Sequence, residues 1–213
     1  MRPLLLAVLL AVVPCMAAAG APASTAAPEP SVAQVLAAFA EAPEQPQAYQ
    51  AAVSLHVRLR VFPFVHLTLH GTSTYERPGH YRFAFHGMPI VAKAFSKMTY
   101  DLGDPKTWPE QYEIAFAPGN TAATPVLRLT PKKAMLVRAL DIALDPAHGR
   151  ILRATWMRGD GGVITLAQTY VPGNDGHDVV TKQDATINLP TMKASLEADY
   201  ADFQAQALAA AQR

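Results

Sequence analysis

The sequence has a single cysteine, Cys15, in a chain of 213 residues. This cysteine lies in an apolar segment and follows Pro14, whereas a lipoprotein signal has a small residue directly before its cysteine. If the segment is removed, the mature chain has no thiol, which excludes a disulfide, a thiolate metal site and a cysteine nucleophile. A domain of this length needs no disulfide, because it buries a sufficient core.

The sequence also lacks an apolar run long enough to cross a bilayer, which takes about 20 residues. The short run at residues 4–13 follows Arg2 and precedes a stretch of small residues. That order is typical of a secretory signal. We therefore expect a signal peptide over residues 1–23, cleaved after Ala19 or Ala23, and a periplasmic location.

Neither sign of charge dominates, since 18 lysines and arginines face 17 aspartates and glutamates. This balance offers no strongly basic surface, so no nucleic acid is expected as a partner. The sequence has no Gly-x-Ser-x-Gly elbow, no His-Glu-x-x-His, no phosphate-binding glycine loop and no dinucleotide fingerprint. Asp160 lies among glycines, where a hairpin turn explains it. We therefore predict a protein that is not an enzyme and has no cofactor.

What the sequence does have is a nearly unbroken alternation of apolar and polar residues from Val53 to Phe85. A period of two predicts antiparallel strands with one apolar face and one polar face. A hairpin centred on Pro63 would place Leu59 opposite Leu67 and Val57 opposite Leu69. The residues expected on the apolar face, as core or as the lining of a ligand groove, are Val57, Leu59, Leu67, Leu69, Tyr75, Tyr81, Phe83 and Phe85.

Histidines on the polar face raise the question of a metal site. In the register centred on Pro63, His56 lies opposite His70, but this pair alone lacks the three or four protein ligands that zinc usually takes. His66 lies about 13 Å from His70 along the strand, at about 3.3 Å per residue, so these two cannot share an ion. We predict no metal site and expect a solvated polar face.

Elements on either side of this hairpin are expected to complete one domain, residues 31–213, after a linker at 24–30. Ser31 and Gln34 match a capping box, which predicts an amphipathic helix that ends near Glu41. The alternation then breaks, and residues 87–118 are expected to hold a short helix or lid, with a loop at 104–109. A meander of strands is predicted near 112–117, 126–130, 136–144, 150–158, 163–171, 178–188 and 191–200, and the tail after Asp202 as a frayed helix or disordered.

Two segments of the sequence resemble a known family. Tyr75 to Phe83 is similar to the Arg-Pro hairpin of the periplasmic lipoprotein carriers of the LolA and LolB superfamily, and Leu127 to Lys132 is similar to the Leu-x-Leu-x-Pro-Lys segment that follows it. The chain departs from the family between Lys93 and Tyr112, so it resembles a divergent member. The resemblance covers residues 31–190. It implies an α+β fold whose antiparallel sheet curves into an incomplete, half β-barrel, with an N-terminal helix and a short helical lid.

The resemblance also implies a site. In the family, the concave apolar face takes up acyl chains, and the arginine of the turn falls here on Arg77. Arg77 would then hold the helical lid through hydrogen bonds to backbone carbonyls, and the aromatic residue that follows falls on Tyr81. Met88, Phe95 and Met98 would line the groove as adaptable apolar side chains, or pack as ordinary core.

We therefore expect a monomeric carrier of lipid or lipoprotein acyl chains, acting in the manner of outer-membrane lipoprotein sorting. Membrane-bound donor and acceptor proteins are the further partners that the resemblance implies. Two alternatives stay open. The first is a periplasmic envelope-stress sensor or regulator on the same fold. The second is a β interaction module whose apolar face is filled by its own side chains.

Overall fold

The computed structural model describes residues 30–42, 46–60, 64–77, 80–87, 102–173 and 176–205. The predicted signal peptide, most of the linker, and Met88, Phe95 and Met98 lie outside these residues. In chain order the elements are α1 (Val32–Glu41), β1 (Ala48–Leu59), β2 (His66–Glu76), β3 (His80–Phe85), the 3-10 turn η2 (Pro105–Thr107), α2 (Trp108–Gln111), β4 (Tyr112–Phe116), β5 (Val126–Pro131), β6 (Val137–Asp145), β7 (Arg150–Arg158), β8 (Val163–Pro172), β9 (Asp178–Leu189) and β10 (Met192–Ala205).

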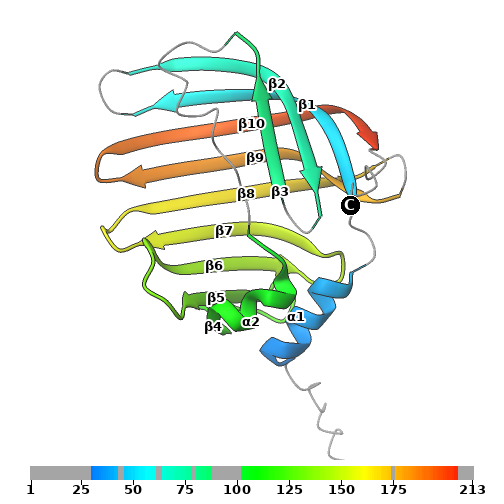
Figure 1. Ribbon diagram of the computed structural model, residues 1–213, viewed down its shortest axis with the longest axis vertical. Helices are drawn as coiled ribbons and strands as arrows, with labels where there is room; N and C mark the ends of the chain where they lie inside the picture. Colours follow the sequence, from blue (N-terminus) through cyan, green and yellow to red (C-terminus); the bar gives the residue numbers. More distant parts are fainter. Residues whose placement is uncertain are drawn as a thin grey trace, which may run out of the picture.

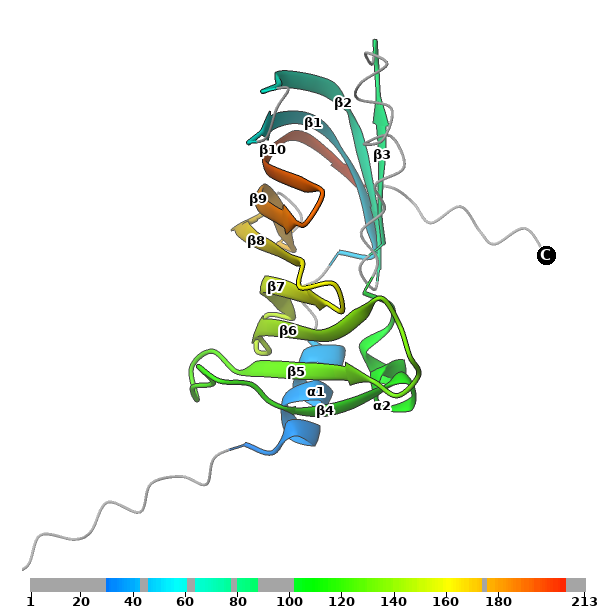
Figure 2. The same cartoon turned by 90° about the vertical axis from the view of Figure 1, so that its left-hand side faces the viewer.

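All ten strands form one antiparallel sheet in the order β3-β2-β1-β10-β9-β8-β7-β6-β5-β4 (Figure 1). The first and last strands of the chain, β1 and β10, therefore pair in the middle of the sheet, and β3 and β4 form its two edges. The sheet is curved and does not close. Figure 2 shows β3 and helix α2 on the same, concave side of it. The predicted α+β fold with an open half-barrel is confirmed.

Helix α1 begins as the sequence predicts. The Ser31 hydroxyl accepts a hydrogen bond from the Gln34 backbone N–H at 3.3 Å, and the Gln34 side chain accepts one from the Ser31 N–H at 2.7 Å. These two bonds satisfy amide donors that have no partner inside the helix. Val35 and Phe39 are the buried face of α1, and the Phe39 ring stacks on Trp108 at a centroid distance of 6.1 Å. The helix therefore docks through a single apolar stripe.

The register of the first hairpin differs from the prediction by two residues. Val57 pairs with Leu67 and Leu55 with Leu69, so the hairpin is not centred on Pro63. A shift of two keeps every side chain on its face, which is why the alternation alone fixes the faces but not the partners. His56 consequently lies opposite Thr68, to which it hydrogen bonds at 2.9 Å, and not opposite His70.

Two further expectations need correction. Residues 104–109 are not an open loop, because Asp104 caps the turn η2 by accepting the Lys106 N–H at 2.9 Å, and the short helix α2 follows directly. The chain also does not leave the strand at Asp202. This residue adopts a positive φ of 53° and β10 continues to Ala205. The other predicted strands match the observed ones to within two residues at each end, apart from the longer end of β10.

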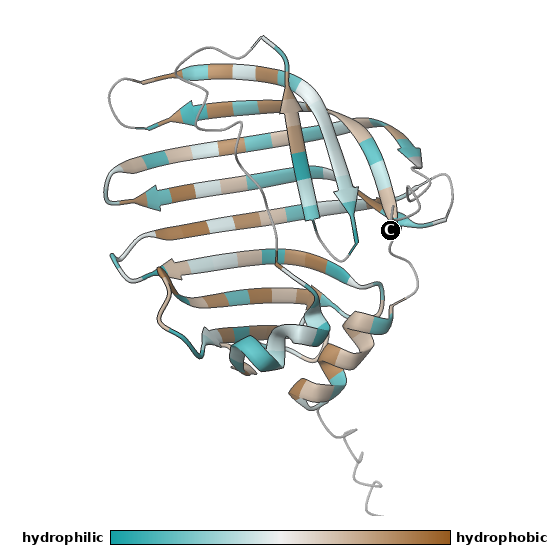
Figure 3. Ribbon diagram, viewed as in Figure 1, coloured by the Kyte–Doolittle hydropathy of each residue, from teal (hydrophilic) through white to brown (hydrophobic). Residues whose placement is uncertain are grey.

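Apolar and polar residues alternate along most strands, as Figure 3 shows, and the buried apolar residues form two main clusters. In the part of the chain that the structure describes, no helix has the length and hydropathy needed to span a membrane.

Candidate functional site

Two apolar clusters fill opposite parts of the concave face. At the β4 edge, Val35, Phe39 and Trp108 pack on strands β5 to β7, so α1 and the η2–α2 segment cover the concave face there. At the other side, strands β1 to β3 and β8 to β10 bury a cluster that includes Tyr49, Tyr75 and Tyr81. The two clusters thus cover both sides of the concave face. The space between them is the candidate ligand site.

An apolar groove of about 280 Å³ lies in this space. Twelve of its fourteen lining residues are apolar, and they come from seven different strands. The lining residues are Val53, Leu55, Phe83, Phe85, Val137, Trp156, Arg158, Ile164, Leu166, Gln183, Ala185, Ile187, Leu196 and Ala198. The walls match the chemistry of a hydrocarbon chain, since ligand sites are concave and mostly apolar with a few polar groups.

The groove runs obliquely across the strands. One end lies where Val137 pairs with Arg158, at the start of β6 and the end of β7. The other end lies at Val53 of β1 and Phe85 of β3, which both pair with Gly71 of β2. An extended ligand would therefore cross the strands at an angle, with one end near the β7–β8 turn.

The two polar lining residues are held by neighbours. Arg158 pairs with Asp160 at 2.7 Å, and this bond, helped by the Gly162 N–H, lowers the pKa of the Asp160 carboxyl to about 2. The Gln183 carbonyl oxygen accepts a hydrogen bond from the buried Tyr200 hydroxyl at 2.6 Å. Within the described residues the amide nitrogen of Gln183 has no acceptor. Because that nitrogen is covered, the groove offers a ligand little polar recognition.

A stack of buried tyrosines stands beside the groove. The rings of Tyr49 and Tyr75 lie 4.9 Å apart, and so do those of Tyr75 and Tyr81. Burial, the largest cause, raises the pKa of Tyr49 to about 12 and raises those of Tyr75, Tyr81 and Tyr200 well above the ordinary value. The hydroxyls stay neutral over the physiological range, so this stack supports the sheet and carries no charge.

The residues predicted for the groove divide into three groups. Phe83 and Phe85 line it, with parallel rings 6.0 Å apart. The next group fills the core without lining the groove, fully buried or half-buried against the tyrosine cluster: Val57, Leu69, Tyr75, Tyr81, Leu59 and Leu67. The third group, Met88, Phe95 and Met98, lies outside the described residues. Contact of Phe83 and Phe85 with a ligand stays a prediction.

The sequence analysis missed most of the groove wall, which comes from β6 to β10. Trp156, Ile164, Leu166, Ala185 and Ile187 line it from β7, β8 and β9. Those segments were predicted as strands, and the period of two along them places these residues on one face of each strand. The sequence did not show which strands pair with each other. The alternation of residues within a strand predicts its two faces, but it does not predict the order of the strands in the sheet.

Arg77, at the end of β2, reaches the last turn of helix α1. Its guanidinium donates to the carbonyl oxygens of Ala40 at 3.3 Å and Ala42 at 3.4 Å, and its backbone N–H donates to Gln47 at 2.8 Å. The last carbonyls of a helix have no partners within it, so an arginine fork suits them. A polar cleft lined by Arg77, Phe39 and Lys106 lies beside this contact. The opening of such a contact as a latch stays a prediction.

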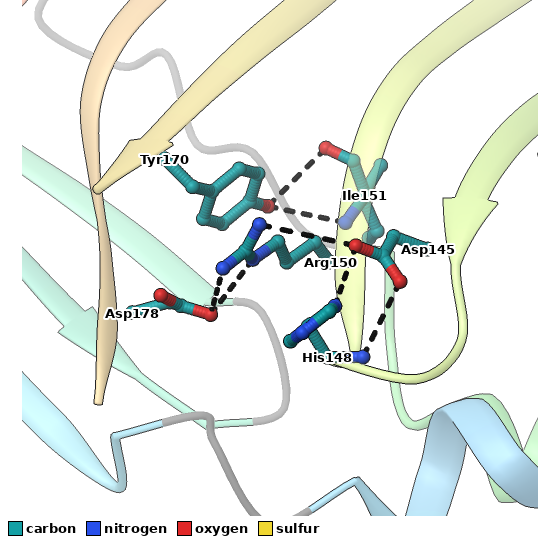
Figure 4. Close-up of polar contacts among 6 residues, drawn as sticks. All are labelled: Asp145, His148, Arg150, Ile151, Tyr170 and Asp178. Atoms are coloured by element: carbon teal, nitrogen blue, oxygen red, sulfur yellow. Dashed lines mark hydrogen bonds and ion pairs between the residues drawn. The ribbon is translucent and has the colours of Figure 1, made fainter. Parts of the chain in front are cut away.

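A polar cluster lies at the turn ends of β6 to β9, and Figure 4 shows its side chains. Arg150 donates to the buried Asp178 carboxylate at 2.7 Å and lies 3.8 Å from Asp145, while its guanidinium lies 5.8 Å from the centre of the Tyr170 ring. Each charge has an opposite partner, so the cluster reads as a structural tie between β7 and β9. No group of three metal-binding side chains occurs among the described residues.

Comparison with known proteins identifies the fold. No protein-family model and no curated protein matches the chain. The chain is similar to the crystal structure of a domain from Vibrio parahaemolyticus that is assigned to outer membrane lipoprotein sorting, with a TM-score of 0.51 and 14% identity over 82% of this chain and 90% of that one. A DUF1329 family protein from Desulfovibrio piger is similar with a TM-score of 0.54 and 11% identity, over 81% of this chain and 90% of that one. At these identities the likeness shows the fold alone, and it confirms the resemblance at that level.

Proposed function

We propose that the protein binds an acyl chain in the apolar groove and carries it through the periplasm, as part of lipid or lipoprotein transport. The observation that carries the proposal is the groove itself, an open apolar channel on the concave face of the sheet with two polar residues at its walls. The likeness in fold to a domain assigned to outer membrane lipoprotein sorting supports the same reading. The groove's function is to bind and release; no step of catalysis is part of the proposal.

The size of the groove fits a single chain. Ligand pockets usually enclose about 300–1,000 Å³, and 280 Å³ lies just below the lower end of that range. Burying each methylene contributes about 0.8 kcal/mol, so a segment of about ten methylenes gains about 8 kcal/mol before the costs of immobilisation. Dissociation constants near micromolar correspond to about 8 kcal/mol. Reversible binding, which a carrier needs, is therefore within reach.

Arg77 is proposed as the latch that controls entry. Its two hydrogen bonds to Ala40 and Ala42 tie α1 to the end of β2. A net value of about 1 kcal/mol for each bond is small enough for a ligand to overcome. Release of α1 would uncover the cluster around Phe39 and Trp108 and lengthen the apolar surface beyond the groove.

The first test is native mass spectrometry of the mature protein purified from a periplasmic extract, followed by extraction with organic solvent. A retained lipid or acylated peptide supports the proposal and gives the cargo class. If the mass is that of the bare chain, the protein is offered a fluorescent fatty-acid probe. Trp156 provides a second signal, because it lines the groove while Trp108 is buried under α1. The absence of both retained lipid and probe binding would mean that the apolar face is ordinary core.

A pair of variants locates the binding site. Ala185→Phe places a ring inside the groove and should weaken probe binding by roughly tenfold or more, since it displaces several methylenes. Thr186→Phe is the matched control, because residue 186 is exposed and the next position on a strand points to the opposite face. Equal binding by the two variants would place the ligand elsewhere.

A further inference from the structure

One end of the sheet gathers four of the strand connections, and we call it the hairpin end. It comprises the connections β1–β2, β5–β6, β7–β8 and β9–β10 and lies at the left in Figure 1. The pairings place them together: Leu59 faces Ala194 at the end of β1, and Val137 faces Arg158 at the start of β6. The end of the groove marked by Val137 and Arg158 opens at this same end.

The hairpin end carries most of the large apolar side chains that are strongly exposed. Phe64 is 72% exposed, Met135 59% and Leu136 60%. The other large exposed apolar residues of the described chain, Phe116 and Val171, are about 40% exposed and lie elsewhere. Exposed apolar groups gathered in this way mark a surface that contacts another phase or partner.

The same end is basic although the whole chain is nearly neutral. Its exposed basic residues are Arg60, Lys132, Lys133, Arg138 and Lys193. None of the five forms an ion pair with a described residue, and the charge of Asp160 is matched by Arg158. Two glutamates, Glu110 and Glu113, flank Lys132 from α2 and β4 and leave the end positive.

The opposite end of the sheet has the opposite sign. Its carboxylates outnumber its basic side chains, Arg77, Arg82 and Arg150. The carboxylates are Glu41, Glu76, Asp145, Asp178 and Asp202. The molecule is therefore a charge dipole along the strands, and a negatively charged surface would attract it with the hairpin end forward.

We propose that the hairpin end docks on the surface of a bilayer that contains anionic lipids, with the mouth of the groove facing that surface. Basic side chains bind the lipid phosphates, and Phe64, Met135 and Leu136 enter the boundary between headgroups and acyl chains. A ligand could then pass between the bilayer and the groove without crossing water. The inference concerns a surface outside the groove and goes beyond the proposed function.

The test is sedimentation of the full mature chain with vesicles of phosphatidylcholine, alone or mixed in equal parts with phosphatidylglycerol. Binding to the anionic vesicles should be roughly tenfold tighter or more, and it should weaken as salt rises. Lys133→Glu combined with Lys193→Glu should reduce binding by roughly twenty-fivefold or more, since each basic residue near an anionic surface contributes roughly a factor of five.

Matched controls separate position from net charge. Lys106→Glu combined with Arg153→Glu makes the same change in net charge at exposed sites away from the hairpin end and should leave vesicle binding within about twofold of the wild type. Leu136→Ser should weaken the binding that persists at high salt, whereas Val171→Ser should not.

The proposal is overturned if the two kinds of vesicle bind equally, if the wild type binds neither, or if the two charge-reversal pairs behave alike. Probe binding without vesicles, measured on the same folded variants, should be unchanged. Vesicle binding without any probe binding would support the docking surface and contradict the proposed function. Probe binding without vesicle binding would support the proposed function and contradict the docking surface.

Discussion

Arg77 and Ala40 are 37 positions apart in sequence, yet the guanidinium of one donates to the carbonyl of the other at 3.3 Å. With the second bond to Ala42, this contact is the side-chain tie between helix α1 and the end of β2. Arg77→Ala should remove both bonds and lower the free energy of unfolding by about 1–2 kcal/mol. Amide hydrogen exchange of α1 should accelerate more than exchange in the centre of the sheet, because the local opening becomes easier.

The control for Arg77 is Arg82→Ala. Arg82 is exposed and pairs with Glu76 at 3.3 Å, a surface ion pair that should contribute less than about 1 kcal/mol. If the two alanine variants lose the same stability, or if exchange in α1 does not change, Arg77 is a solvated side chain and not a latch.

Gly71 allows β3 to lie close to β2 where β3 folds over the groove. A Cβ atom at this position would lie 2.2 Å from the carbonyl oxygen of Ala84, closer than any side chain tolerates. Gly71→Ala should therefore push β3 away and cost about 1–3 kcal/mol of stability, as overpacking does. Since Phe83 and Phe85 on β3 form one groove wall, probe binding should weaken as well.

The matching control is Gly159→Ala, whose Cβ would meet the flexible side chain of Arg138 at 3.3 Å and the Leu136 carbonyl oxygen at an ordinary contact distance of 3.8 Å. Thermal unfolding of this variant should stay close to that of the wild type. A Gly71→Ala protein as stable as Gly159→Ala would show that β3 is not fixed against β2 in solution.

Ser73 has a buried hydroxyl group without a hydrogen bond to any other described residue. It is 0% exposed, and among the described residues its oxygen has no hydrogen-bond partner. Burying such a group costs about 1–3 kcal/mol. We expect Ser73→Ala to raise the free energy of unfolding in urea by about 1 kcal/mol, while Ser195→Ala, at a half-buried site on β10, changes it little. A marked loss of stability in Ser73→Ala would mean that the hydroxyl has a partner.

The buried tyrosines predict alkaline unfolding. Burial raises the pKa of Tyr49 from 10.0 to about 12, so the folded state favours the neutral phenol. A group whose pKa is raised on folding contributes stability that is complete below its unfolded value and is lost as the pH rises through the folded value. The free energy of unfolding should therefore hold up to pH 10 and fall between pH 10 and about 12.

The phenolate absorbance measures this directly. The signals of Tyr49, Tyr75, Tyr81 and Tyr200 should appear together with the loss of the sheet signal in circular dichroism, because all four phenols are buried. Tyr49→Phe should reduce the dependence on pH. Ionisation of all tyrosines near the ordinary pKa, with the fold intact, would contradict the burial of this stack.

The sequence predicts the elements of this protein better than their partners. Val57 and Leu69 were placed on the correct face because a period of two is a local property, but they were paired with each other although the sheet pairs Val57 with Leu67. The capping box of α1 was visible because Ser31 and Gln34 are three positions apart. Both the faces of the strands and the N-terminal cap of α1 can be predicted because they depend on residues close together in the sequence.

The groove was predicted only in part, for the same reason. Phe83 and Phe85 were assigned to the groove from the alternation within their own strand. Ile164 and Ala185 line the groove because β10 pairs with β1, β9 with β10 and β8 with β9. That pairing joins residues such as Val57 and Leu196, far apart in the chain. The resemblance implied that Arg77 donates to backbone carbonyls of a helical lid, whereas the accepting carbonyl of Ala40 belongs to the N-terminal helix α1. The period of the strands does not predict this contact.

The pairing of β1 with β10 at the centre of the sheet also sets the order in which the chain can fold. Strands β2 and β3 join the remaining strands through β1, and β1 in turn joins them through β10, which begins only at Met192. Loop closure over so many residues is slow, and it cannot start before the last strand has emerged. A chain with this topology keeps the seam between β1 and β10 unpaired until synthesis is nearly complete, so the two halves of the sheet can join only after almost the whole chain has been made.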